Sequence, residues 1–186
     1  MSTQAYSVQD RRSVWLCAAL LVAGCASASL VFACATPFAA FAVLAAAVLP
    51  LRTALTTIVL VWAVNQAIGF GILDYPRDLN SAMWGLGIGV VALLTTVAAA
   101  GVIRQFARLS SYAIYPIALV ACYAVYELVM LAMVPMLGGI ESFSLEIVGR
   151  LAFVNAIWLA GLLVAYELLR RVNGLVPNGT PGRRSL

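Results

Sequence analysis

Six apolar runs, separated by short polar or charged segments, fill most of this sequence. They cover approximately residues 14–34, 38–50, 54–73, 81–103, 112–134 and 148–169. Five of the runs have the roughly 20 residues that a helix needs to cross about 30 Å of hydrocarbon. Lipid offers no hydrogen bonds to the backbone, so segments of this kind are expected to be helical. The runs therefore predict an all-α integral membrane protein.

Composition supports this prediction and narrows the possible chemistry. Of the 186 residues, 64% are apolar and 10% are charged, whereas roughly 25% are charged in a typical soluble domain. There is no histidine, and all eleven basic residues are arginine. The commonest general base, the commonest transition-metal ligand and the lysine of Schiff-base or P-loop chemistry are thus missing. We expect no catalytic residue, no metal site and no cofactor, and any energy from ATP must come from another chain.

The positions of the arginines predict how the chain crosses the membrane. If all six runs cross and the N-terminus is cytoplasmic, nine arginines fall inside and only Arg77 and Arg150 fall outside. Such a distribution obeys the positive-inside rule. If residues 14–50 crossed only once, the arginine-rich C-terminal segment would lie opposite Arg11 and Arg12. The arginines are scattered and form no stripe of the kind that binds nucleic acid.

We therefore expect a six-transmembrane-helix bundle in the cell (cytoplasmic) membrane, with both termini cytoplasmic. Its parts are a cytoplasmic segment 1–13, a transmembrane domain 14–172 and a disordered cytoplasmic tail 173–186. The run 38–50 has 13 residues and reaches only about 20 Å as a helix. It is either tilted within the bundle, extended into its flanks, or half of a hairpin that begins at Thr36 and Pro37.

The four cysteines lie inside apolar runs and form no CxxC motif. Cys17, Cys25, Cys34 and Cys122 are therefore expected to be small buried side chains rather than metal ligands or disulfides. The segment 22–25, VAGC, also resembles a lipoprotein cleavage box. In that alternative the chain is cut before Cys25, which is then lipidated.

Polar and aromatic side chains in the outer half of the spans are the best candidates for function, because polar groups are costly at membrane depth. Aromatic walls with a few polar groups are typical of a ligand pocket. The candidate substrate-binding residues are Asn65, Gln66, Asp74, Asn80, Trp84, Tyr123, Tyr126, Glu127, Arg150, Asn155 and Trp158.

Each candidate also has an interpretation that needs no ligand. Asn65 or Gln66 can join neighbouring helices by hydrogen bonds. The tyrosines and Trp84 can form an aromatic belt at the membrane interface. Glu127 can be paired with Arg150. The segment 74–80 is either a lid over the pocket or a turn in which Asn80 or Ser81 begins the next span.

Small residues predict two places of close helix packing. Gly85, Gly87 and Gly89 form GxGxG inside an apolar run, which is not a nucleotide-binding motif and favours close packing. Ala19, Ala23 and Ser27 recur every four positions in the first run. They predict a groove where a partner helix docks, although small residues are common in membrane helices.

The architecture resembles the substrate-binding (S) component of an energy-coupling factor (ECF) vitamin transporter. The shared features are the chain length, six spans, an unusual second span, alanines in the first span and polar residues near the outer face. In that family the S component captures a vitamin outside, and a transmembrane coupling protein with two ATPases drives its release inward. The resemblance implies that Ala19 and Ala23 dock on the coupling protein. It also implies a pocket built from spans four to six, at Trp84, Tyr123, Tyr126, Glu127, Arg150, Asn155 and Trp158.

No motif indicates which vitamin would bind, and the absence of histidine disfavours the nickel and cobalt members. Two other classes of function stay open. One is a non-catalytic subunit or assembly factor of a larger membrane complex, in which the polar groups only join helices. The other is a small integral-membrane enzyme that uses Glu127, or Asp74 with Asp78, as acid or base. A secondary transporter is less favoured because no inverted repeat is evident.

Overall fold

The computed structural model describes residues 8–32 and 35–173, which form six α-helices and one 3-10 turn. The elements are α1 (Val8–Phe32), α2 (Phe38–Val48), α3 (Leu51–Gly71), α4 (Leu79–Gln105), α5 (Ser111–Leu137), η1 (Ile140–Phe143) and α6 (Leu145–Val172). Each apolar run corresponds to one helix, and no strand occurs among these residues. The structure is thus an all-helical membrane protein, as predicted. The segment 1–7 and the tail 174–186 lie outside the described residues.

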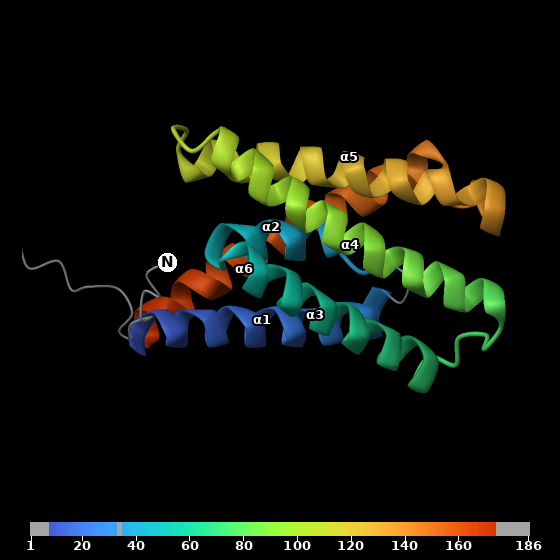
Figure 1. Cartoon of the computed structure of the whole chain (residues 1–186), viewed down its shortest axis with the longest axis horizontal. Helices are drawn as coiled ribbons and strands as arrows, with labels where there is room; N and C mark the ends of the chain where they lie inside the picture. The colour runs from blue at the N-terminus through green and yellow to red at the C-terminus, as the bar shows by residue number, and fades with distance from the viewer. Residues whose placement is uncertain (1–7, 33–34, 174–186) are drawn as a thin grey trace, which may run out of the picture.

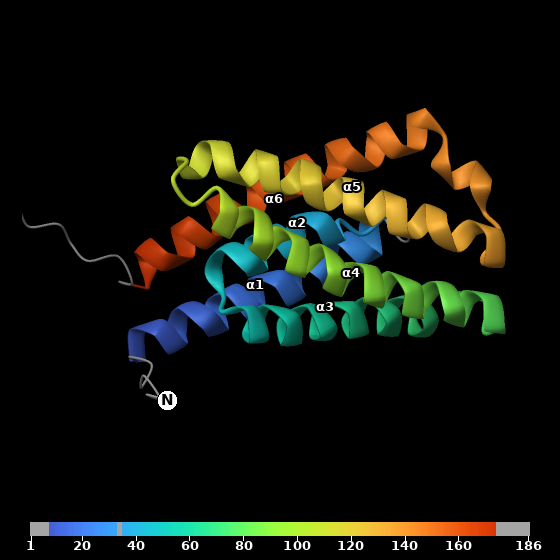
Figure 2. The same cartoon turned by 45° about the horizontal axis from the view of Figure 1, so that its top comes forward.

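The helices run in alternating directions along the long axis of the molecule (Figures 1 and 2). Helices α1, α3 and α5 run one way, and α2, α4 and α6 return. Val8 and Val172 consequently lie at one end of the bundle, which we call the terminal end. Segments 72–78 and 138–144 lie at the opposite end, which we call the loop end.

Charged residues divide between these two ends. The terminal end carries Arg12, Arg52, Arg104, Arg108, Arg170 and Arg171. The loop end carries Arg77 and Arg150 together with the acids Asp74, Asp78, Glu141 and Glu146. The alternating directions of the helices thus bring together the arginines that the sequence analysis assigned to one side.

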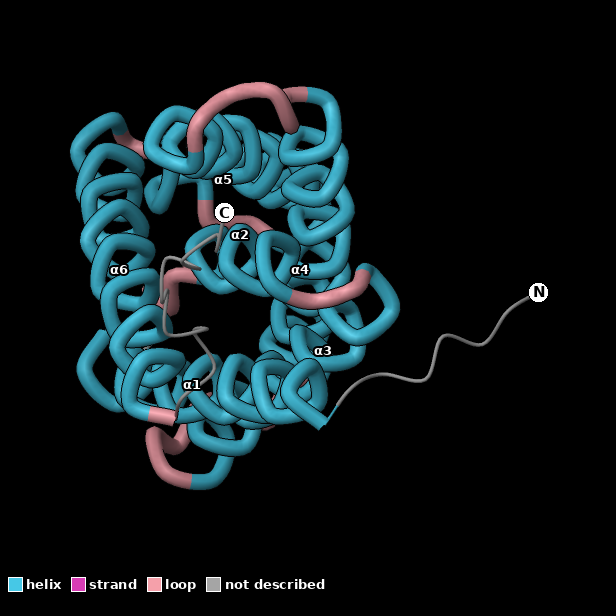
Figure 3. Tube along the Cα trace, turned by 90° about the vertical axis from the view of Figure 1, so that its left-hand side faces the viewer, coloured by secondary structure: helices cyan, strands magenta, loops and turns pink. Residues whose placement is uncertain are grey.

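Helix α2 is short because it lies inside the protein. Five helices are long and apolar enough to cross a membrane, whereas α2 has 11 residues. It occupies the centre of the bundle (Figure 3), contacts all five other helices, and buries every residue from Phe38 to Ala45. The helix begins directly after Pro37, and this proline supplies no side-chain cap. The short second run is therefore part of the protein core.

Glycines let α4 approach its neighbours closely. A Cβ added to Gly85 would overlap Gln66 of α3, and one added to Gly87 would overlap Met133 of α5. The prediction that the GxGxG segment serves close packing is confirmed.

The three described cysteines, Cys17, Cys25 and Cys122, are free and buried. The Cys25 thiol donates a hydrogen bond to the carbonyl of Val61 on α3, at 3.3 Å. The prediction of small buried side chains is confirmed for these three. Cys34 lies outside the described residues.

Candidate functional site

A cavity of about 500 Å³ lies at the loop end of the bundle. Its wall is formed by helices α3, α4, α5 and α6, the start of α2, segment 72–78 and the turn η1. Its aromatic lining consists of Phe38, Phe70, Tyr75, Trp84, Tyr126 and Phe143. The volume falls within the roughly 300–1,000 Å³ of typical small-molecule sites, which are also mostly apolar and aromatic. The cavity is therefore of a size and character suited to a small organic ligand.

Segment 72–78 folds back over the end of α3 and closes one side of the cavity. The amide of Tyr75 donates to the carbonyl of Gly69 at 3.0 Å. The Tyr75 ring packs so closely on Gly69 that an added Cβ would lie 2.6 Å from it. The same ring meets Phe70 edge to face, with ring centroids 6.1 Å apart. The turn passes through Asp74, whose φ is 50°. Asp74 is exposed and does not line the cavity.

The start of α4 differs in detail from the sequence prediction. Asp78, rather than Asn80 or Ser81, caps the helix, because its Oδ1 accepts a hydrogen bond of 2.7 Å from the amide of Ser81. This bond holds the pKa of the exposed Asp78 carboxyl below its usual value, since the Ser81 amide stabilises the charged form. Asn80 instead donates to the carbonyl of Leu137 at 2.9 Å. Asn80 therefore ties the start of α4 to the end of α5 outside the cavity.

Asn65 and Gln66 both line the cavity, but Asn65 also joins several parts of the bundle. Its Nδ2 donates to the hydroxyls of Ser29 and Thr36, each at 2.9 Å. Its Oδ1 accepts a bond of 3.0 Å from Nε2 of Gln66. Both hydrogens of the Asn65 amide are thus used within the protein. The hydrogen bonds favour a structural role for Asn65 and hold Gln66 at the cavity wall.

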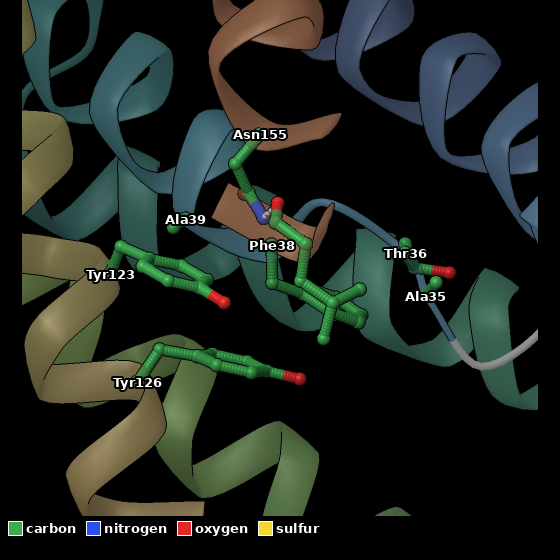
Figure 4. A pocket seen from close by; sticks show the side chains of 8 residues that line it. Ala35, Thr36, Phe38, Ala39, Tyr123, Tyr126 and Asn155 are labelled. Atoms are coloured by element: carbon green, nitrogen blue, oxygen red, sulfur yellow. Dashed lines mark hydrogen bonds between the residues drawn. The ribbon is translucent and has the colours of Figure 1, made fainter. Parts of the chain in front are cut away.

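Tyr123 and Asn155 lie beside the main cavity, around a smaller space of about 20 Å³ (Figure 4). Tyr126 borders both spaces. The Tyr123 hydroxyl donates to the carbonyl of Val148 at 2.7 Å. Oδ1 of Asn155 accepts from the amide of Ala40 at 3.1 Å, and its Nδ2 donates to Leu151. Both side chains therefore bond to backbone groups of the bundle.

Arg150 and Trp158 do not line the cavity. Arg150 is exposed near the start of α6. The ion pairs among the described residues join Glu167 to Arg170 and Arg171, so the alternative of a Glu127–Arg150 pair is not realised. Trp158 packs its ring edge to face against Phe32 and Phe41, at centroid distances of 6.5 and 6.0 Å. It belongs to the packing between α1, α2 and α6.

Glu127 is the unusual group of the cavity. It lies on α5, ten residues before the helix ends at Leu137, and it lines the cavity. Its Oε1 is buried and receives no hydrogen bond from the described residues. The neighbouring Tyr123 hydroxyl donates to the carbonyl of Val148 at 2.7 Å and also interacts with the Glu127 carboxylate, but Oε1 stays without a donor among the described residues. A carboxylate in this state at membrane depth is costly and is characteristic of a functional position.

Of the predicted candidates, Asn65, Gln66, Trp84, Tyr126 and Glu127 meet in the main cavity. Sequence reasoning missed lining residues near the helix ends, chiefly Phe70, Tyr75, Met130, Ser142 and Phe143. Phe70 lies in the last turn of α3, whereas Tyr75 and Phe143 lie in the segments between the α-helices at the loop end. Their position near the ends of the predicted spans was the signal available in the sequence.

The candidate docking residues Ala19, Ala23 and Ser27 lie on an exposed face of α1. The Ser27 hydroxyl bonds to the carbonyl of Ala23 at 2.9 Å, within its own helix. Larger exposed side chains, Trp15 and Leu30, border this line of small residues. We call these three small residues the α1 face.

Comparison of the chain with family models, curated proteins and solved structures gave no match.

Proposed function

We propose that this protein is a membrane-embedded substrate-binding subunit of an ECF-type importer, which captures a small, water-soluble, vitamin-like molecule. The observation that carries the proposal is the loop-end cavity of about 500 Å³, with its aromatic wall and the unbonded carboxylate oxygen of Glu127. In the proposed orientation the arginine-rich terminal end is cytoplasmic. The cavity then faces the outside of the cell, where a substrate would be captured.

The α1 face supports the second half of the proposal, which is delivery to a partner. Ala19, Ala23 and Ser27 are exposed, whereas residues that only pack the bundle would be covered by other helices. Small side chains let the backbones of two membrane helices approach closely. We propose that a transmembrane coupling protein docks there and that associated ATPase subunits supply the energy. The proposed role involves binding without a covalent step.

The direct test is to purify the protein after expression in rich medium and to identify any co-purifying small molecule by mass spectrometry. A molecule bound in stoichiometric amount is the expected result. It should be lost from Trp84→Ala, because Trp84 lines the cavity. It should be kept by Met83→Ala, because Met83 is the next residue on α4, is 39% exposed and does not line the cavity.

A purely structural subunit is the second candidate, and one observation favours it. Asn65 and Asn155 use their side-chain amides for hydrogen bonds to other segments of the bundle. This interpretation predicts that no small molecule co-purifies and that Trp84→Ala and Met83→Ala behave alike. It also predicts a stable protein partner, which co-purification would reveal. The carboxylate of Glu127 has no function in that case.

A further inference from the structure

We infer that the loop-end cavity binds an organic cation that carries an aromatic or heteroaromatic ring. The inference rests on the proposed function and adds the chemical class of the substrate. Two independent features of the cavity lead to it, namely its charge and its aromatic wall.

Among the described residues, the cavity lining contains an acidic side chain, Glu127, and no basic one. The two arginines of the loop end, Arg77 and Arg150, are exposed and do not line the cavity. Arg77 donates instead to the carbonyl of Phe70, at 3.3 Å. Oε1 of Glu127 has no hydrogen-bond donor among the described residues, and a carboxylate oxygen in a low-dielectric site is destabilised unless a cation or a strong hydrogen-bond donor meets it. A bound cation would supply the partner that Glu127 Oε1 lacks within the described residues, whereas an anionic ligand would be repelled by the Glu127 carboxylate.

The wall of the cavity fits the same kind of ligand. Six aromatic rings surround the space next to Glu127, from Phe38, Phe70, Tyr75, Trp84, Tyr126 and Phe143. Aromatic faces attract cations, and the attraction is strongest for tryptophan. The same faces stack on a flat ring. Positive charge and an aromatic ring in one ligand would therefore use both features.

A bare metal ion does not fit this site. Calcium takes 6–8 oxygen ligands at about 2.3–2.6 Å, and magnesium requires a compact octahedron. The described residues contain no group of three acidic, cysteine or histidine side chains placed to hold a metal. A cavity of about 500 Å³ with a mostly aromatic lining is also far larger than one ion needs. The cation is therefore expected to be organic.

The test uses three indoles of nearly equal size and different charge, titrated into the purified protein. Tryptamine is cationic, indole-3-propionamide is neutral and indole-3-propionate is anionic. We expect tryptamine to bind more tightly than the amide, and the propionate to bind most weakly. In Glu127→Gln the advantage of tryptamine over the amide should fall by roughly tenfold or more, the size expected for a charge-assisted hydrogen bond. The affinity for the amide should change little.

Glu141→Gln is the matched control, because Glu141 is an exposed acid at the same end that does not line the cavity. It should keep the preference of the unmodified protein for tryptamine. Glu127 Oε1 makes no hydrogen bond with the described residues, so Glu127→Gln is expected to fold. If the variant does not fold, the order of the three affinities, measured on the unmodified protein, still tests the inference.

The inference would be overturned if the propionate bound as tightly as tryptamine or more tightly. It would also be overturned if Glu127→Gln kept the full preference for tryptamine over the amide. If none of the indoles binds, the inference is tested by the charge of the molecule that co-purifies with the protein. A neutral or anionic molecule overturns the inference and leaves the proposed function standing, and a ring-bearing cation supports both. If no molecule co-purifies and no indole binds, the proposed function fails together with the inference.

Discussion

Trp62 on α3 donates its indole N–H to the backbone carbonyl of Gly85 on α4, at 2.8 Å. The same indole packs against Gly89, one helical turn further along α4, where an added Cβ would lie 2.9 Å from the ring. The bond satisfies a polar group that lipid would leave unpaired. Gly89 thus leaves room for the Trp62 indole between α3 and α4, next to Gly85 of the cavity wall.

Gly89→Ala should therefore destabilise the protein. The new methyl group must push the Trp62 ring away, and we expect a cost of about 1–3 kcal/mol, typical of overpacking a tight site. Unfolding of the detergent-solubilised protein by increasing denaturant measures this loss. Gly101→Ala on the same helix is the control, since its added Cβ would meet no atom of the described residues within 4 Å apart from the neighbouring backbone of α4. That change should be neutral or stabilise by up to about 1 kcal/mol. Equal effects of the two substitutions would contradict the proposed packing.

Asn155 should contribute to stability rather than to affinity. Its Oδ1 accepts the Ala40 amide, in the first turn of α2, where Pro37 offers no cap. Asn155→Ala leaves this amide without its partner, and we expect a loss of about 1–2 kcal/mol in the free energy of unfolding. Asn173→Ala removes an exposed hydrogen bond from the residue after α6 to the carbonyl of Leu169 and should cost less. A loss of ligand affinity at unchanged stability would instead make Asn155 a binding residue.

The positions of the helices could be predicted because lipid offers no hydrogen bonds to the backbone, so that a long apolar run in a membrane is expected to be helical. At most of their ends, the predicted runs and the observed helices differ by only a few residues. Charged residues and prolines mark the ends of both. The length of the run 38–50 alone did not decide how this segment is placed in the bundle. Its helix, Phe38–Val48, is short because protein, not lipid, surrounds it. A sequence pattern records that a segment is apolar but not which apolar surroundings it has.

The depth of the polar residues could be predicted, but not the direction in which each side chain points. Tyr123 and Glu127 share a face of α5, and yet the first bonds to Val148 whereas the second has an unbonded oxygen. Asn155 and Trp158 also share a face, which turns toward α2 rather than into the main cavity. Rotation of a helix depends on all its neighbours. Tyr75 enters the wall only because a loop folds back, which no periodicity encodes.

Acid should weaken the cap at the start of α4. The pKa of Asp78 lies below its ordinary value of 3.8, chiefly because of the hydrogen bond from the Ser81 amide. Folding therefore favours the charged form, and this contribution to stability is complete above the unfolded pKa and is lost as the pH falls through the folded pKa. Asp78→Asn keeps an acceptor without a titrating charge.

We expect the wild type to lose stability relative to Asp78→Asn as the pH is lowered from about 5 to below about 3. Thermal unfolding of both proteins across that range is the measurement. A stability difference that stays constant with pH would show that the charge of Asp78 does not contribute.

The two ends of the bundle should lie on opposite sides of the membrane. We expect the terminal end to be cytoplasmic, because it carries most of the arginines. Glu141→Cys at the loop end and Arg108→Cys at the terminal end can be compared in a background without the native cysteines, since both positions are exposed. A membrane-impermeant maleimide should label the first but not the second in intact cells. The reverse pattern would invert the orientation, and labelling of both would contradict the six-helix crossing.

The α1 face should serve the partner and not the ligand. None of the residues that line the main cavity comes from α1, so Ala23→Leu should leave ligand affinity unchanged. A larger side chain there would hold a partner helix away, because close approach depends on small residues. We therefore expect Ala23→Leu to reduce both uptake by cells and co-purification of the coupling protein. Ala67→Leu makes the same change at an exposed alanine of α3. It should reduce neither uptake nor co-purification of the coupling protein. If Ala23→Leu lowered affinity while the complex survived, the assigned roles of the two surfaces would be reversed.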